Sequence, residues 1–279
     1  MLLLLAAALP VLLRQAPPAD AVKLPPPSVQ YRINVASATR SPFLVSNGWR
    51  FLRNPQARYF YDVQGPQAAL AAAEAWMFGA IALVRTDASG VQPFAEMLDF
   101  LRALGPNDAP AVADIGFIDD GSATAGEVMN MLVRDNLLFK VVPRPDPNLK
   151  LTVRLGSKEF PLADAANPPL MAHEIRARLT DEKRSIRIYG SEVVVARLTA
   201  LPDGIRVRLL NYDAARRKVD GIRVRVLGKY TVRRVAAAGS PDEKPLDIAS
   251  DAEATEFTLP ELKTCAVIDL KNGNLKNGD

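Results

Sequence analysis

The sequence predicts an α/β domain followed by a small all-β domain, and two observations carry this prediction. Up to about residue 190, segments with apolar residues at helical spacing alternate with short apolar runs, as in helices and buried parallel strands. Beyond it, apolar and polar residues alternate between Gly, Asp and Pro turns, as in antiparallel strands. The chain has 279 residues, of which 48% are hydrophobic, enough to bury cores of this size.

The N-terminus has the pattern of a secretory signal. Residues 2–13 form an apolar run, shorter than the roughly 20 residues of a membrane span, and Ala19-Asp20-Ala21 matches a cleavage site. We expect residues 1–21 to be a signal peptide and the protein to be secreted or periplasmic, with no membrane span after signal removal. A buried helix is the alternative, since no Lys or Arg precedes the run. The proline-rich residues 22–30 are expected to be a linker.

Local signals place the next elements, in the region 31–190. Pro66 opens a helix that Gly79 ends, because proline suits the first helical position and glycine the left-handed end. The apolar run 80–84 predicts a buried strand. Pro93 is expected to open a second helix, which Gly105-Pro106 stops.

Residues 112–142 predict a strand, an acidic Gly/Ser loop, a helix and a second strand. Thr124 and Glu127 have the spacing of a capping box at the start of this helix. Asn136 suits a left-handed helix end, with Leu137 folding back onto the helix. The whole segment is a βαβ unit, which predicts a parallel pair of strands.

The remaining elements complete both domains. Residues 149–156 predict a half-buried strand, and Pro168 opens a helix to about Leu179. Several strands then predict an antiparallel β-sandwich at 191–270, and the polar residues 271–279 a flexible tail.

Cysteine, histidine and net charge exclude several classes of function. Cys265 is the only cysteine, so an intrachain disulfide and a thiolate metal cluster are excluded, and its apolar surroundings indicate a buried residue. His173 is the only histidine and lies off the apolar face of its helix, so we expect no metal and no cofactor. The net charge of +4 does not indicate nucleic acid. An exported chain without disulfides suits a bacterial envelope.

Asp119 and Asp120 are the main catalytic candidates. They end a predicted parallel strand, where open α/β sheets place ligands. Neighbouring residues of an extended chain point in opposite directions, so a glycosidase-like pair, about 5–9.5 Å apart, needs Asp87 or Glu127 as partner. The alternative is an acidic turn before a helix N-terminus, where negative charge is favourable.

Two other segments are candidate binding surfaces. Residues 47–63 concentrate aromatic and basic side chains that suit carbohydrate binding, with a core or docking strand as the alternative. Residues 204–234 hold ten basic and two acidic side chains, a local charge of +8, in a pattern that predicts arginines along one sheet face. An anionic polysaccharide or the envelope surface would suit that face, and a solvated face is the alternative. The first candidate set is Trp49, Arg50, Arg53, Tyr59 and Tyr61, and the second is Arg206, Arg208, Arg223 and Arg225.

Three stretches together resemble a known family: "AAAEAWMFGAIALVRTD", "ADIGFIDDGSATAGEVMNMLVRDNLLFKVV" and "FTLPELKTCAVIDL". Residues 70–270 resemble the C-terminal portion of β-galactosidase-like glycoside hydrolases, in which a TIM barrel precedes a glutamine-amidotransferase-like domain and a small β domain. The resemblance implies a barrel-like remnant at 31–105, an amidotransferase-like (flavodoxin-like) parallel sheet at 106–190 and the β-sandwich at 191–270.

The departures from the family bear on catalysis. A TIM barrel takes roughly 200–250 residues, and fewer than 90 lie between the signal and Pro110. An amidotransferase needs a Cys at a strand–helix elbow, whereas Cys265 lies in the other domain. We therefore expect an exported, carbohydrate-associated protein without independent catalysis, which binds glycan or a partner chain. The alternatives are a glycoside hydrolase-like enzyme and an oligomerisation module, since amidotransferase-like domains in this architecture can serve oligomer contacts.

Overall fold

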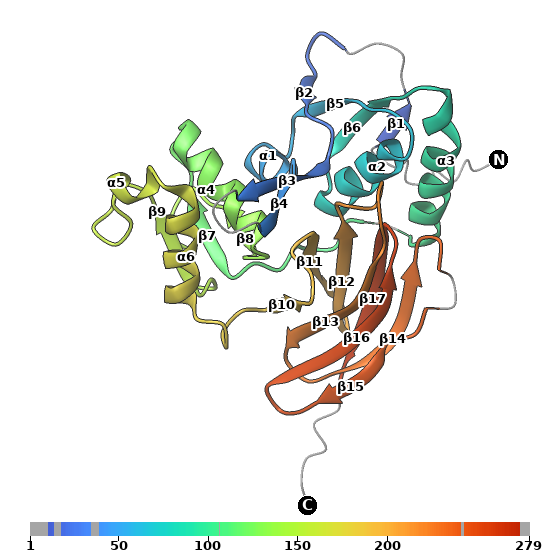
Figure 1. The fold of residues 1–279 in the computed structure, drawn as a ribbon. Helices are drawn as coiled ribbons and strands as arrows, with labels where there is room; N and C mark the ends of the chain where they lie inside the picture. The colour runs from blue at the N-terminus through green and yellow to red at the C-terminus, as the bar shows by residue number, and fades with distance from the viewer. Residues whose placement is uncertain (1–10, 14–17, 35–38, 106, 241–242, 274–279) are drawn as a thin grey trace, which may run out of the picture. The chain divides into compact units, whose positions relative to one another are not determined.

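The computed structural model describes residues 11–13, 18–34, 39–105, 107–240 and 243–273 (Figure 1). The chain divides into two compact units. The first comprises Met1–Ala109 and Tyr212–Arg216, and the second Pro110–Asn211 and Arg217–Asp279. The boundary predicted at residue 105 lies close to Ala109, where the long N-terminal part of the first unit ends. The boundary predicted at residue 190 falls inside the second unit.

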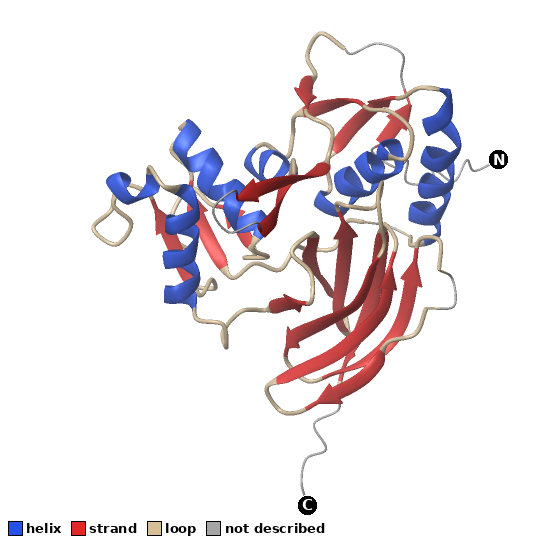
Figure 2. Ribbon diagram, in the orientation of Figure 1, coloured by secondary structure: helices blue, strands red, loops and turns tan. Residues whose placement is uncertain are grey.

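A parallel sheet forms the centre of the first unit. Its strand order is β1-β6-β5-β2, and all three pairings are parallel. The helix α2 connects β5 to β6, and α3 follows β6 and packs against α2 (Figure 2). The elements are β1 (Val11–Leu13), β2 (Val22–Leu24), β5 (Arg58–Asp62), α2 (Gln67–Phe78), β6 (Ile81–Arg85) and α3 (Ala88–Ala103).

A hairpin and a short helix complete this unit. The hairpin consists of β3 (Ser28–Asn34) and β4 (Thr39–Val45), and α1 (Gly48–Arg53) follows it. The ring of Phe51 in α1 meets the edges of two aromatic rings of β5, at 4.7 Å from Tyr59 and 6.5 Å from Tyr61 between centroids. These contacts bury the helix-facing side of the sheet.

The predicted helix at 66–78 is confirmed, but the start of the next helix was wrong. α2 ends at Gly79, which has φ 70° in the left-handed region. α3 begins at Ala88, because the Asp87 carboxylate accepts a hydrogen bond from the backbone N–H of Gly90, at 3.1 Å. Pro93 lies inside the helix, where its missing N–H leaves the carbonyl of Ser89 without its usual donor.

The second unit contains a three-stranded parallel sheet of order β8-β7-β9. The helix α4 connects β7 to β8, so the predicted βαβ unit is confirmed. Across the sheet, the strand that is second in the chain comes first, followed by the first and the third, as at the start of doubly wound sheets of order 2-1-3-4-5. The elements are β7 (Ile115–Ile118), α4 (Ala123–Arg134), β8 (Phe139–Val141), β9 (Leu151–Arg154), α5 (Leu162–Ala165) and α6 (Pro168–Leu179).

The C-terminal end of α4 matches the prediction, whereas its N-terminal cap does not. Asn136 has φ 54°, and the backbone N–H of Leu137 bonds to the carbonyl of Leu132 at 2.9 Å, as in a Schellman motif. The N-cap is Ser122, whose hydroxyl accepts from the N–H of Ala125 at 3.1 Å. Thr124 therefore lies within the helix, and the predicted capping box with Glu127 was wrong.

Two four-stranded antiparallel sheets form the rest of the second unit. Their strand orders are β10-β13-β16-β15 and β11-β12-β17-β14, and apolar side chains of both sheets share one core. This confirms the all-β region, but β10 had been predicted within the α/β part. The strands are β10 (Ile186–Tyr189), β11 (Val194–Leu201), β12 (Gly204–Asn211), β13 (Val219–Leu227), β14 (Tyr230–Ala237), β15 (Leu246–Ser250), β16 (Ala254–Leu262) and β17 (Cys265–Asn272).

Strands also occur in the segments predicted as signal and linker. β1 lies within the predicted signal and pairs with β6, and β2 lies within the predicted linker and pairs with β5. Strands thus begin before residue 31, although most of the predicted signal lies outside the described residues. Of the tail predicted at 271–279, residues 271 and 272 belong to β17, and residues 274–279 lie outside the described part. Among the described helices, none has the length and apolar character that crossing a membrane requires.

Candidate functional site

The loop after β7 carries Asp119 and Asp120 at the carboxyl end of the central strand, as predicted. The Asp119 carboxylate accepts from the backbone N–H of Gly121 at 3.0 Å, and the Asp120 carboxylate from that of Ser122 at 2.9 Å. These are Asx turns, in which each carboxylate orders the backbone two residues ahead. Both side chains therefore shape the loop that leads into α4.

Asp87 and Glu127 are the two proposed partners of these acids. Asp87 belongs to the first unit and caps α3, accepting also from the N–H of Gly65 at 2.9 Å. That backbone hydrogen bond and others lower the pKa of Asp87. Glu127 belongs to the second unit and is exposed on α4. Among the described residues, no group of three or more His, Cys, Asp or Glu side chains could hold a metal ion.

The aromatic segment of the first unit is mostly core. Tyr59 and Tyr61 are only 2% and 0% exposed, so the prediction that their rings contact a sugar was wrong. The Tyr59 hydroxyl donates to the carbonyls of Arg50 and Asn54, both at 2.8 Å, and burial raises its pKa to about 12. Trp49 is half-buried, with the Arg50 guanidinium 4.3 Å from its ring centroid. Trp49, Arg50 and Arg53 are the candidates of this segment whose side chains stay partly exposed.

A buried carboxylate, Glu74 of α2, was missed by the sequence reasoning. Its side chain is 0% exposed and lies in an alanine-rich helix. The hydroxyls of Tyr61 and Tyr212 each donate to it at 2.6 Å. The only signal in the sequence was a single acid amid an apolar helix, because buried acids are rare unless they have partners.

The turn before α1 supplies the other donors to Glu74. The backbone N–H of Asn47 donates to Oε1 at 2.6 Å, and the Asn47 side-chain amide donates to Oε2 at 3.2 Å. The Ser46 hydroxyl lies 3.2 Å from Oε1. Burial raises the pKa of Glu74, and the hydrogen bonds from Tyr212, Tyr61 and Asn47 oppose that rise. The cluster is fully enclosed and joins four segments of the first unit.

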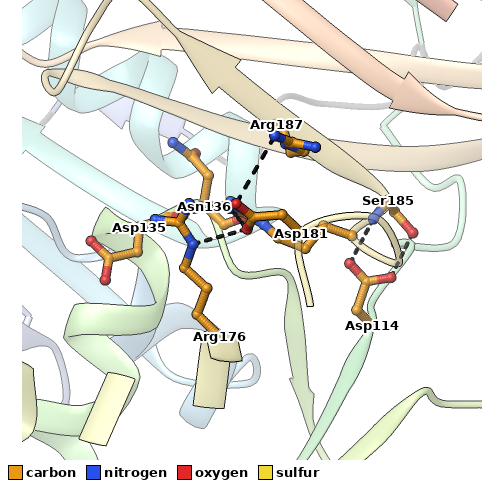
Figure 3. Close-up of polar contacts among 8 residues, drawn as sticks. Asp114, Asp135, Asn136, Arg176, Asp181, Ser185 and Arg187 are labelled. Carbon is orange, nitrogen blue, oxygen red and sulfur yellow. Dashed lines mark hydrogen bonds and ion pairs between the residues drawn. The ribbon is translucent and has the colours of Figure 1, made fainter. Parts of the chain in front are cut away.

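A second polar cluster lies in the second unit, where Asp181 follows α6 (Figure 3). The Arg176 guanidinium donates to both Asp181 oxygens, at 2.9 and 2.7 Å, and Arg184 donates at 3.0 Å. The bond from Arg176 is the largest cause that lowers the pKa of Asp181. Arg184 also donates to the carbonyl of Asp135 at 2.9 Å. The arrangement ties α6 to the end of α4.

Nearby, Asp114 fastens the start of β7 (Figure 3). Its carboxylate accepts from the backbone N–H of Ser185 at 2.9 Å and from the Ser185 hydroxyl at 2.6 Å. Lys150 lies 2.8 Å from the same carboxylate. All three groups are satisfied within the fold, as a buried acid requires.

The four candidate arginines lie on two different sheets, which corrects the prediction of one basic face. Arg206 and Arg208 are on β12, and Arg223 and Arg225 are on β13 of the other sheet. Strands with the same alternating pattern can occupy either layer of a sandwich, because the pattern defines only which side faces the core.

Three of the four arginines form ion pairs, and the fourth, Arg208, is buried. Arg206 forms two hydrogen bonds with Asp269, at 2.6 and 3.0 Å. Arg208 is 3% exposed, and burial lowers its pKa to about 9. On the other sheet, Glu256 lies 2.7 Å from Arg223 and 3.6 Å from Arg225. The excess of basic residues therefore overstates the free positive charge.

Cys265 and His173 lie as expected. Cys265 is fully buried, and burial raises the pKa of its thiol to about 12. His173 is exposed on α6, away from the buried Met171, Ile175 and Leu179. Neither residue belongs to a cluster with catalytic spacing in the part of the chain described.

Comparison with known proteins gives a fold but no family. No family model matches the chain, and no curated protein matches it. The α-L-fucosidase isoenzyme 2 from Paenibacillus thiaminolyticus matches over 81% of this chain and 62% of its own, with 10% identity and a TM-score of 0.59. A maltogenic α-amylase from Thermotoga neapolitana matches over 81% and 58%, with 9% identity and a TM-score of 0.23.

The fucosidase match is the informative one. The amylase superposes too poorly, at a TM-score of 0.23, to support any argument about the fold. The chain spans less than two thirds of the fucosidase, and at 10% identity the likeness concerns the fold alone. The chain therefore has a fold like that of part of a glycoside hydrolase.

Proposed function

We propose that this chain is a carbohydrate-associated protein that binds glycan and has no independent catalytic activity. The observation that carries the proposal is the fold likeness to a fucosidase over 81% of the chain at a TM-score of 0.59. In finer terms, we assign the first unit to a barrel segment and the β8-β7-β9 sheet to an amidotransferase-like domain. A secreted or periplasmic location, which would place the protein near polysaccharides, is part of the proposal.

The local hydrogen bonds of Asp87, Asp119 and Asp120 support a binding role over a hydrolytic one. Asp87 caps a helix in the first unit, whereas Asp119 and Asp120 bond to backbone of their own loop in the second. A glycosidase needs one acid to protonate the leaving group and another to attack or activate water. Carboxylates engaged in turns and caps are poorly placed for either task.

We assign the glycan contact to Trp49 and Arg50. The ring of Trp49 is half-buried on α1, and the guanidinium of Arg50 stacks on it at 4.3 Å while Nη1 lies 3.4 Å from the Asn47 side-chain oxygen. An aromatic ring can cover the C–H face of a sugar, and a guanidinium beside it can donate to sugar hydroxyls. Arg53, in the last turn of the same helix, lies near enough in sequence to extend this platform.

A glycan array with the full chain tests the proposal, with Trp49→Ala as the decisive variant. The second unit offers a matched control, because Tyr189 is also partly exposed and has the Arg187 guanidinium 5.1 Å from its ring centroid. We expect Trp49→Ala to abolish binding and Tyr189→Ala to leave it intact. Absence of binding by the wild-type chain, or equal binding by Trp49→Ala, would contradict the proposal.

Two alternatives make different predictions. A glycoside hydrolase-like enzyme would release the chromophore from aryl glycosides, and Asp119→Asn and Asp120→Asn would each remove that activity. An oligomerisation module is favoured by Leu162 and Leu170, which are 56% and 46% exposed in α5 and α6. Light scattering of the wild type and of Leu162→Asp with Leu170→Asp would then show a change of mass.

A further inference from the structure

Five residues between β12 and β13 belong to the first compact unit rather than the second. Tyr212–Arg216 cluster with the first unit, whereas Asn211 before them and Arg217 after them cluster with the second. The chain therefore returns to the first unit for a single short segment. We call residues 212–216 the returning segment.

Three side chains hold the returning segment. The Tyr212 hydroxyl donates to Glu74 of α2 at 2.6 Å and lies 2.8 Å from the Ser46 hydroxyl. Asp213 accepts from the Tyr31 hydroxyl of β3 at 2.7 Å. The Arg216 guanidinium lies 5.7 Å from the centroid of the Tyr31 ring. The segment thus bonds to a helix, a turn and a hairpin of the first unit.

We propose that the returning segment is a clasp that the first unit needs for its own core, and that it makes both units unfold in one cooperative transition. Tyr212 is 1% exposed, and its hydroxyl bonds to the buried Glu74 carboxylate of the first unit. Without Tyr212 the buried Glu74 carboxylate loses one of its two shortest hydroxyl donors, which is costly for a buried acid.

The clasp couples the unfolding of the two units because its chain continues into the strands of the second unit. The returning segment is bonded directly to Asn211, the last residue of β12, and it continues to β13. These strands belong to different sheets of the sandwich, so unfolding of the sandwich removes the restraint on both ends of the segment. The first unit would then have to hold five residues of a flexible chain, which costs conformational entropy.

The structure offers a matched set of tyrosine variants. Tyr212→Phe removes a hydroxyl from the clasp. Tyr59→Phe removes a hydroxyl from a tyrosine of similarly low exposure in the same unit, and the bonds of that hydroxyl go to Arg50 and Asn54 and not to the clasp. Tyr31→Phe removes the second anchor, the bond to Asp213.

Limited trypsin digestion of the native full chain measures how often the clasp opens. Arg216, Arg217 and Lys218 are exposed cleavage sites at its C-terminal end. A site is cut only when the local backbone opens, so the cleavage rate follows the opening equilibrium. We expect Tyr212→Phe, and more strongly Tyr212→Phe with Tyr31→Phe, to speed cleavage at these sites about 10-fold relative to Tyr59→Phe.

Calorimetry of the same proteins gives the second readout. The wild type is expected to melt in one transition and the double variant in two, with the lower one shifted by roughly 5–10 °C. Two separate transitions in the wild type would overturn the proposal. Equal acceleration of cleavage by Tyr59→Phe would also overturn it, because the effect would then be general loss of stability. If the double variant does not fold, the single variants give the same comparison.

Discussion

Glu74 in the first unit and Asp181 in the second are both held by several donors, but their acidities shift in opposite directions. Neutral hydroxyl and amide groups surround Glu74, and burial raises its pKa. Guanidinium groups surround Asp181, and the bond from Arg176 lowers its pKa. The comparison teaches that the charge of the donors and the access of water decide the shift, rather than the number of hydrogen bonds.

The largest effect should come from removing the Glu74 carboxylate. In Glu74→Leu, the hydroxyls of Tyr61 and Tyr212 and the N–H of Asn47 lose their acceptor inside the core. We expect the free energy of unfolding to fall by about 3–5 kcal/mol, measured by urea denaturation. Glu74→Gln keeps one acceptor oxygen and should lose clearly less. Equal stability of Glu74→Leu and the wild type would show that the network contributes nothing.

The pH dependence of stability should differ in sign between the two acids. The pKa of Glu74 in the folded protein lies above the ordinary 4.5, so between these two values the folded protein binds a proton that the unfolded chain has lost. The free energy of unfolding therefore falls as pH rises from 4.5 through the folded pKa. The folded pKa of Asp181 lies below the ordinary 3.8, so its contribution is present above 3.8 and is lost as pH falls.

Urea titrations from about pH 3 to pH 8 on the full chain would separate these two effects. Glu74→Gln should lose only the decline above 4.5, and Asp181→Asn only the decline below 3.8, each slope being at most about 1.4 kcal/mol per pH unit. If both variants keep the wild-type profile, the opposite shifts of the two acids are wrong.

The smallest effect concerns the backbone that presents Asp181. Thr180 ends α6 with φ 59° and ψ 150°, a conformation that essentially only glycine adopts without strain. The bonds from Arg176 and Arg184 to Asp181 act against this strain. Thr180→Gly should raise the free energy of unfolding by about 1 kcal/mol, after the entropy cost of glycine in the unfolded chain. Thr180→Ala keeps the Cβ and should show no gain; a gain as large as that of glycine would rule out strain.

Local signals predicted the helices and strands well where neighbours in sequence determine them. The Gly79 helix end and the Asn136 motif follow from residues within one turn, and both are present. The cap of α4 was misassigned because Ser122 and Thr124 both suit the position, and only the backbone shows which is extended.

Contacts between residues that are far apart in the chain could not be predicted from the sequence. The donors to Glu74 come from residues 13 to 138 positions away, so no local pattern could reveal the cluster. Arg206 and Arg223 share an alternating pattern, but the assignment of their strands to different sheets depends on pairing between distant strands. The burial of Tyr59 and Tyr61 likewise follows from packing by α1, which is not visible in composition.

The rate at which the single cysteine reacts with an alkylating reagent can report how often the β-sandwich opens. Cys265 begins β17, an interior strand that pairs with both β12 and β14. Its thiol is enclosed, and with a pKa of about 12 it forms almost no thiolate at neutral pH. An alkylating reagent can therefore mark this sulfur only after the sheet has opened. Each labelled molecule records one such opening, so the lifetime of the sandwich can be timed without any engineered probe.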